Sequence, residues 1–161
     1  KDRGVCEIAN DNAVGQIIIS GDKNKVASFQ SILKQKKIKT IPLKVSAPFH
    51  CSLMKPAAKI MKDKIKNVNF KIPIYKILSN VTANPETSPE KIKNLLVEQI
   101  FSTVKWRESI IYMSNEGIKN FIEIGPGKAL SGMVKRTIKN SKSFSINSIT
   151  DMKNLENEFK K

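Results

Sequence analysis

Short apolar blocks of two kinds alternate along this chain, and their order constrains the fold more than any other feature. In one kind the apolar residues are consecutive or alternate, as in strands, and in the other they recur at helical spacing. The predicted strands are residues 5–9, 16–20, 38–45, 74–78 and 121–124, and the predicted helices are residues 23–37, 51–67, 89–101, 105–116 and 128–139. This alternation predicts an α/β protein with parallel strands in the middle of the chain.

Turn and capping residues mark the ends of several elements. Residues 10–15 (NDNAVG) are rich in turn formers and predict a hairpin between the first two strands. Asp22 is expected to cap the first helix. Ser88, which precedes a proline and an acid, is expected to cap the helix at 89–101. Gly117 is placed to end the next helix.

The charge is strongly positive, with 29 Lys and Arg against 14 Asp and Glu and a net charge of +15. Only Arg3, Arg107 and Arg136 are arginines, and the lysines are spread along the whole chain. Surfaces that bind nucleic acid usually combine arginine with interleaved aromatic residues, which are scarce here. A solvated lysine-rich surface is therefore favoured over a nucleic-acid-binding module, although this charge would still attract an acidic macromolecule.

Cysteine content and hydropathy indicate the compartment. Cys6 and Cys51 form no disulfide framework and lack metal-ligand spacing, so a reducing cytoplasm is the default expectation. The longest apolar stretches, such as residues 17–19, are far shorter than the ~18 to 20 residues of a membrane span, and no signal-peptide core is found. We expect a soluble protein without a membrane segment.

His50 is the only histidine, and acid–base chemistry near neutral pH would depend on it. It follows a predicted strand and precedes a predicted helix, where α/β sheets place functional groups, but these features alone favour a structural histidine over a catalytic base. No G-x-S-x-G nucleophile motif accompanies it. The neighbouring Cys51 is expected to be a small packing residue.

Two other features were weighed as binding sites. Residues 125–127 (GPG) lie between a strand and a helix, where phosphate can bind, but the central proline has no N–H and a structural turn is favoured. Asp11, Glu123 and Asp151 are isolated in the sequence. No metal site is predicted.

Seven segments, in order along about residues 5 to 140, together resemble malonyl-CoA:acyl carrier protein transacylases. They are 9–12 (ANDN), 15–21 (GQIIISG), 45–50 (VSAPFH), 53–57 (LMKPA), 79–81 (SNV), 99–106 (QIFSTVKW) and 123–130 (EIGPGKAL). An ordered series of this kind is far more specific than any one segment. Val14 departs from the pattern, because the family often has proline there.

The resemblance implies an incomplete fold. Family members are about twice as long, and their first half carries the G-H-S-x-G nucleophile, the oxyanion-hole glutamine and the arginine that binds the malonyl carboxylate. None of these has a counterpart here. The implied domains are an incomplete ferredoxin-like small subdomain at 1–46, the C-terminal part of a hydrolase-like parallel-sheet acyltransferase core at 47–140, and a C-terminal tail at 141–161.

The resemblance also implies roles for individual residues. In the family's ping-pong transfer of malonyl from CoA to the phosphopantetheine thiol of acyl carrier protein, His50 would take the proton of the absent serine. The main-chain carbonyl of Gln99 would fix the tautomer of that histidine, unless Gln99 is simply a surface residue. Asn10 and Asn12 would lie beside the acyl pocket. Phe49 would select malonyl over methylmalonyl, unless it packs in the core.

The expected partners follow from the same resemblance. They are malonyl-CoA, acyl carrier protein and a separate N-terminal half, with no cofactor beyond the phosphopantetheine of the carrier. A lysine-rich helix at 59–66, with Lys135 and Arg136, is either a docking surface for the acidic carrier or an ordinary solvated face. A non-catalytic remnant or binding fragment of the same fold is the alternative function.

Overall fold

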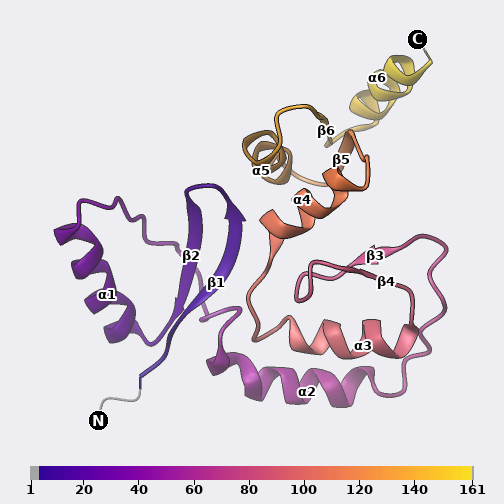
Figure 1. The fold of residues 1–161 in the computed structure, drawn as a ribbon. Coiled ribbons are helices and arrows are strands. Elements are labelled where there is room, and N and C mark those ends of the chain that lie inside the picture. The colour runs from indigo at the N-terminus through magenta and orange to yellow at the C-terminus, as the bar shows by residue number, and fades with distance from the viewer. Residues whose placement is uncertain (1–3, 161) are drawn as a thin grey trace.

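The structure, a computed structural model, describes residues 4–160. An antiparallel hairpin forms the first part of this range. Its strands are β1 (Cys6–Ala13) and β2 (Gln16–Gly21), and helix α1 (Lys23–Gln35) packs against them (Figure 1). The hairpin prediction is confirmed, but β1 extends through most of the segment predicted as a turn. Two register shifts, between Ile8 and Asn10 and between Asp11 and Ala13, accommodate this extension.

The carboxylate of Asp22 does not cap α1 as predicted. Asp22 is the N-cap residue, but its side chain makes no cap hydrogen bond and instead accepts one from the backbone N–H of Val5. The side chain thereby ties the start of the helix to the chain that enters β1.

The predicted strand at 38–45 is wrong, because this segment is an irregular connection. Ile41, Leu43 and Val45 are 70%, 55% and 63% exposed. A strand needs a hydrogen-bonded neighbour. Among residues 4–160 no strand lies beside this segment, and its apolar side chains therefore stay at the surface.

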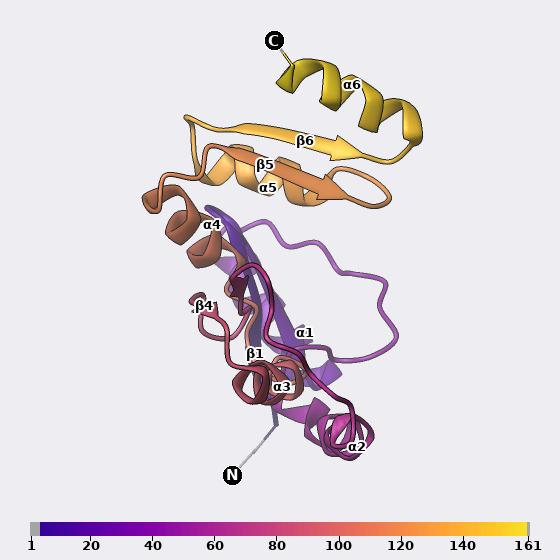
Figure 2. The same cartoon turned by 90° about the vertical axis from the view of Figure 1, so that its right-hand side faces the viewer.

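Two helices lie side by side in the next part of the chain (Figures 1 and 2). A short 3-10 turn (Ser52–Met54) leads into α2 (Lys55–Ile65), and α3 (Pro89–Glu98) begins at Ser88, whose hydroxyl accepts the Lys91 N–H at 3.4 Å. Both helices and the Ser88 cap were predicted.

The buried strand predicted at 74–78 is also wrong. Only β3 (Ile77–Leu78) forms, paired antiparallel with β4 (Pro85–Glu86), while Ile74 and Tyr75 are 92% and 83% exposed. The apolar composition predicts burial, but in the described structure no second sheet layer covers this run.

The C-terminal part is a β-α-β-α unit. It comprises β5 (Asn120–Ile124), α5 (Ala129–Thr137), β6 (Lys142–Ile146) and α6 (Ile149–Phe159). The preceding helix α4 (Trp106–Asn115) ends before Gly117, whose φ of +84° is favourable for glycine. Strands β5 and β6 are parallel, with α5 as their connection. The parallel pair is thus near the end of the chain, whereas we expected parallel strands in its middle.

Residues 142–159, which belong to the predicted C-terminal tail at 141–161, form β6 and α6. Their signal is weak because the strand reads KSFSI, with only two large apolar residues, and α6 is mostly polar. Phe144 of β6 and Phe159 of α6 hold the two together, with ring centroids 5.7 Å apart. The boundaries at residues 46 and 140 stay a prediction.

Strand β1 is joined to a segment almost a hundred residues later. The N–H of Asp11 donates to the carbonyl of Val104 at 2.9 Å, and the N–H of Val104 donates to the carbonyl of Ala9 at 2.8 Å. Arg107 adds a bidentate ion pair to the Asp11 carboxylate, with N–O distances of 2.6 to 3.1 Å. These bonds place the hairpin next to the chain between α3 and α4.

In the described range, no helix is long and apolar enough to cross a membrane.

Candidate active site

His50 is held by the C-terminal end of α3. Its backbone N–H donates to the carbonyl of Ile100 at 3.2 Å, and its Nδ1 lies 2.8 Å from the main-chain oxygen of Gln99. The residue has a φ of +59°, a left-handed conformation that is rare outside glycine. Two hydrogen bonds to one helix end therefore fix an unusual backbone turn.

The position of Gln99 explains why its carbonyl is free for His50. Gln99 is the C-cap of α3, and the last carbonyls of a helix have no partner within the helix. They also lie at the partially negative end of the helix dipole, which favours a donor. Because a carbonyl can only accept, Nδ1 carries the proton, and Nε2 of the neutral ring is left with a lone pair.

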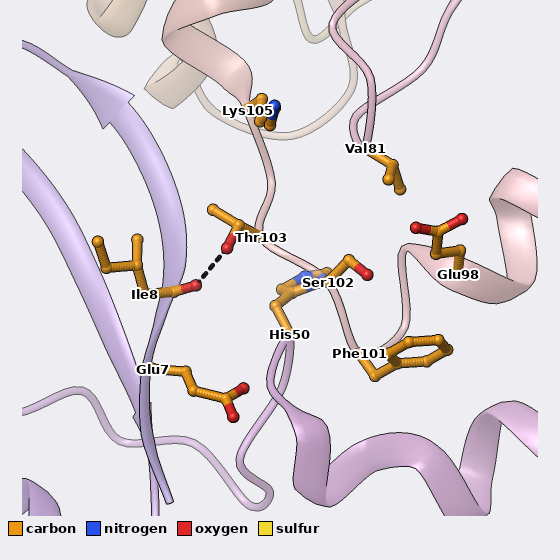
Figure 3. Close-up of a pocket in the computed structure, with 9 residues that line it drawn as sticks. All are labelled: Glu7, Ile8, His50, Val81, Glu98, Phe101, Ser102, Thr103 and Lys105. Carbon is orange, nitrogen blue, oxygen red and sulfur yellow. Dashed lines mark hydrogen bonds between the residues drawn. The ribbon is translucent and has the colours of Figure 1, made fainter.

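An open hollow of about 420 Å³ surrounds His50 (Figure 3). Strand β1, the loop before β4 and the chain after α3 form its walls. The lining residues are Glu7, Ile8, His50, Val81, Glu98, Phe101, Ser102, Thr103 and Lys105. The Thr103 hydroxyl donates to the Ile8 carbonyl at 2.6 Å and closes one side.

Glu7, although it lines the hollow, is already engaged. Its carboxylate accepts hydrogen bonds from the hydroxyl and the backbone N–H of Ser52, at 2.6 and 2.8 Å. The hydroxyl bond is the larger cause that lowers the pKa of Glu7 below its ordinary value, and the backbone bond adds to it. Glu7 is therefore an ionised anchor between β1 and the turn after His50.

The structure does not bring the other predicted site residues into this hollow. Asn12 is 6% exposed and does not line the hollow, while Asn10 pairs through its backbone with Val104. Phe49 is adjacent to His50, but its side chain is 45% exposed and does not line the hollow. The roles of these three residues stay predictions.

The remaining polar features have structural partners. Cys51 is fully buried and its thiol donates to the Pro48 carbonyl at 3.1 Å, consistent with packing. The N–H of Gly127 donates to the side chain of Asn147, which makes residues 125–127 a tied turn. Within residues 4–160, no group of three or more His, Cys, Asp and Glu residues could hold a metal ion.

The predicted basic surface is not one surface. Lys59, Lys62 and Lys64 of α2 and its C-cap residue Lys66 are exposed. Helix α2 lies at the opposite end of the molecule from α5, which carries Lys135 and Arg136 (Figures 1 and 2). Arg136 is also hydrogen-bonded to Gln16 and to the Gly132 carbonyl. The two sets of basic residues therefore lie on separate parts of the molecule.

Sequence reasoning assigned no role to Asn80 or to the Asp11–Arg107 pair. Asn80 belongs to the segment 79–81 that carried part of the resemblance, and its side-chain amide donates to Oε1 of Gln99 at 3.2 Å. That segment was the only signal for Asn80. Nothing local in the sequence connects Asp11 with a residue 96 positions later.

The structure thus defines a mixed α/β scaffold that holds one nitrogen of a histidine against a helix-end carbonyl, an arrangement that suits the other nitrogen to general acid–base chemistry. No family model matches the chain. The chain is 35% identical over 153 residues to a malonyl CoA-acyl carrier protein transacylase of Haemophilus influenzae, covering 94% of this chain and 49% of that protein. It is thus homologous to the malonyl CoA-acyl carrier protein transacylases, as their C-terminal half.

Solved structures agree with this assignment. A malonyl CoA-acyl carrier protein transacylase from Clostridium perfringens matches 98% of this chain and 50% of its own, with a TM-score of 0.93 and 34% identity. A malonyl-transacylase in complex with a type II PKS acyl-carrier protein matches with a TM-score of 0.90 and 32% identity over 96% of this chain and 50% of its own. The chain spans about half the length of the relatives it matches, and it has their fold over that half.

Proposed function

We propose that this chain supplies the histidine half of a malonyl-CoA:acyl carrier protein S-malonyltransferase of type II fatty acid biosynthesis in the cytoplasm. The observation that carries the proposal is the 2.8 Å contact between His50 Nδ1 and the Gln99 carbonyl, because it leaves Nε2 as a proton acceptor. The nucleophilic serine, the oxyanion hole and the malonyl-binding arginine come from residues outside this chain. No cofactor is needed beyond the phosphopantetheine of the carrier.

The proposed reaction has two transfers that use the same proton acceptor. The serine oxygen attacks the malonyl thioester as its proton moves to Nε2 of His50, and the imidazolium returns that proton to the CoA sulfur as the carbon–sulfur bond breaks. The phosphopantetheine thiol then gives its proton to Nε2 and attacks the acyl-serine. The proton finally returns to the serine oxygen, which regenerates the site.

The test uses a complemented protein, defined as this chain combined with the N-terminal half of a relative that carries the serine. His50→Ala should lower malonyl transfer by at least about 100-fold, since general acid–base catalysis contributes about 10²–10⁴-fold. Asn94→Ala, at an exposed site on α3, is the matched control and should leave transfer unchanged. Equal activity of the His50→Ala and control proteins would refute the proposal.

The alternative, a non-catalytic remnant of the fold, makes the opposite prediction. A remnant would give no labelled carrier with radioactive malonyl-CoA even when the complementing half is properly folded. The chain alone should form no acyl-enzyme under either reading, because a histidine without an oriented nucleophile and an oxyanion hole contributes little. Label on Cys6 or Cys51 above a denatured control would contradict this expectation.

A further inference from the structure

Asn80 contacts both ends of the segment that lines one side of the hollow. Its side-chain Nδ2 donates to Oε1 of Gln99 at 3.2 Å, and its backbone carbonyl accepts the N–H of Lys105 at 2.8 Å. One residue in the loop between β3 and β4 therefore holds the chain where it leaves α3 and again where it enters α4.

The loop that carries Asn80 is itself well fixed. The N–H of Ser79 donates to the Asn84 carbonyl at 3.1 Å, and the N–H of Ala83 donates to the Ser79 carbonyl at 2.9 Å. Ala83 is 6% exposed and has a φ of +53°, so the surrounding packing holds it in a left-handed turn. Asn80 therefore lies in a loop whose backbone conformation is fixed by hydrogen bonds and packing.

The residue that Asn80 holds is the one that accepts the His50 hydrogen bond. Helix ends fray readily, and a rotation at the Gln99 C-cap would turn its carbonyl away from Nδ1. Fixing the Gln99 side chain at its amide oxygen opposes this rotation. The resulting series of contacts runs from the Asn80 amide through the Gln99 side chain and backbone to the imidazole.

We propose that Asn80 is a positioning residue for His50. It touches no reacting atom and acts only through Gln99, by keeping the carbonyl directed at Nδ1 and so keeping Nε2 unprotonated and aimed at the hollow. Its effect on transfer rests on the proposed function. Its effect on the histidine tautomer does not.

The tautomer can be read directly, because His50 is the only histidine. In the complemented protein with ¹⁵N-histidine in this chain alone, the ¹⁵N shifts of the neutral ring should report a protonated Nδ1 and an unprotonated Nε2. Asn80→Ala should add a population with protonated Nε2. Asn84→Ala is the control in the same loop and should keep the unsubstituted shifts, since the exposed Asn84 side chain donates to the Thr82 carbonyl at 2.9 Å rather than to Gln99.

Kinetics give the second readout. Asn80→Ala should lower kcat by roughly 10-fold with little change in KM, as expected for a misplaced reacting group rather than lost substrate contacts. Gln99→Ala removes the same hydrogen bond from the other side and should give the same tautomer change. The double variant should be no worse than Gln99→Ala, because both act through one contact.

The outcomes separate this inference from the proposed function. Unchanged ¹⁵N shifts in Asn80→Ala would overturn the positioning role, and so would equal and independent losses in the double variant. If Asn80→Ala does not fold, unchanged shifts in Gln99→Ala overturn it instead. Inactivity of the complemented protein with the expected tautomer change would refute the proposed function and leave the positioning role standing.

Discussion

His50 and Gln99 lie 49 positions apart in the chain, yet the ring nitrogen of one is 2.8 Å from the backbone oxygen of the other. The acceptor is a backbone oxygen, so Gln99→Ala can weaken its orientation but does not remove it. In the complemented protein, we therefore predict that Gln99→Ala lowers transfer much less than His50→Ala does. A loss as large as that of His50→Ala, measured by carrier labelling, would mean that the Gln99 side chain takes part in the reaction.

The isolated chain should be only marginally stable. Strands β5 and β6 form a two-stranded parallel sheet, and Ile124 of β5 is 80% exposed, although parallel sheets are normally covered on both faces. We predict a broad, weakly cooperative melt and fast amide exchange in β5. Addition of the complementing half should slow this exchange. A sharp melt of soluble monomer with protected β5 amides would contradict the prediction.

Adjacent isoleucines on α4 offer a matched pair for the core. Ile110 is 1% exposed, whereas Ile111 is 38% exposed, and α4 packs against β1 beside the site. In the complemented protein, Ile110→Ala should lower the free energy of unfolding by about 2–5 kcal/mol, the usual cost of a buried cavity. Ile111→Ala should cost less than half as much in the same urea titration. Equal costs would place the Ile110 side chain outside the core.

Glu123 predicts a pH dependence of stability. The backbone N–H groups of Ser131 and Leu130 donate to its carboxylate at 2.8 and 3.1 Å, and the Ser131 bond is the largest cause that holds the pKa of Glu123 below its ordinary value of 4.5. Because the folded pKa is the lower one, this stability is present above 4.5 and lost as the pH falls through the folded pKa.

Glu123→Gln should therefore lower the urea midpoint of the complemented protein at pH 7. The difference from the unsubstituted protein should shrink as the pH falls below 4.5. Glu116→Gln, at an exposed glutamate that follows α4, is the control and should have little effect at any pH. If the difference in urea midpoint does not change with pH, the effect of the substitution does not come from the ionisation of Glu123.

Local signals were enough for the helices up to α5, for the hairpin and for β5, but not for the remaining strands or for the site. Ser88 and Gly117 mark helix ends by their own chemistry, so α3 and α4 could be read directly from the sequence. The apolar segment at 38–45 looks like a strand locally, but a strand forms only beside another one. The error at 38–45 thus arises from the absence of a neighbouring strand in the described structure, and the error at 74–78 from the absence of a layer that covers the apolar run.

The site depends on contacts between distant residues. His50 was a candidate because it is the only histidine, but its carbonyl partner was expected only through the family resemblance. Asn80 bonds to Gln99 across 19 positions, and Arg107 to Asp11 across 96. Neither pair leaves a local pattern, since each residue alone reads as an ordinary polar surface residue.

The exposed lysines of α2 should guide the approach of an acidic carrier protein. Charge reversal at Lys62 and Lys66 should slow carrier association in the complemented protein, and the difference should shrink at high salt because exposed charges are screened. Lys135→Glu, on the distant α5, is the matched control. Stopped-flow association rates over a salt series would measure the effect. Rates that do not depend on salt would exclude a steering role for α2.

Phe49 should determine acyl selectivity. In acyltransferases that resemble this chain, phenylalanine before the catalytic histidine accompanies malonyl use, and a small serine accompanies methylmalonyl use. The Phe49 side chain is 45% exposed in the described chain, so it is not part of the core that residues 4–160 form by themselves. A phenyl ring against the acyl α-carbon leaves no room for an extra methyl group, and one methyl is worth about 1–3 kcal/mol, or about 10- to 200-fold in rate.

Phe49→Ser in the complemented protein should therefore raise the methylmalonyl-to-malonyl ratio of kcat/KM by at least about tenfold. The change should come from faster methylmalonyl transfer, because the serine opens space that malonyl does not need. Phe101→Ser is an informative comparison, since that ring lines the hollow from the chain after α3 and is not adjacent to His50. An unchanged ratio in Phe49→Ser would place this ring outside the acyl pocket, and selectivity would then rest on residues outside this chain.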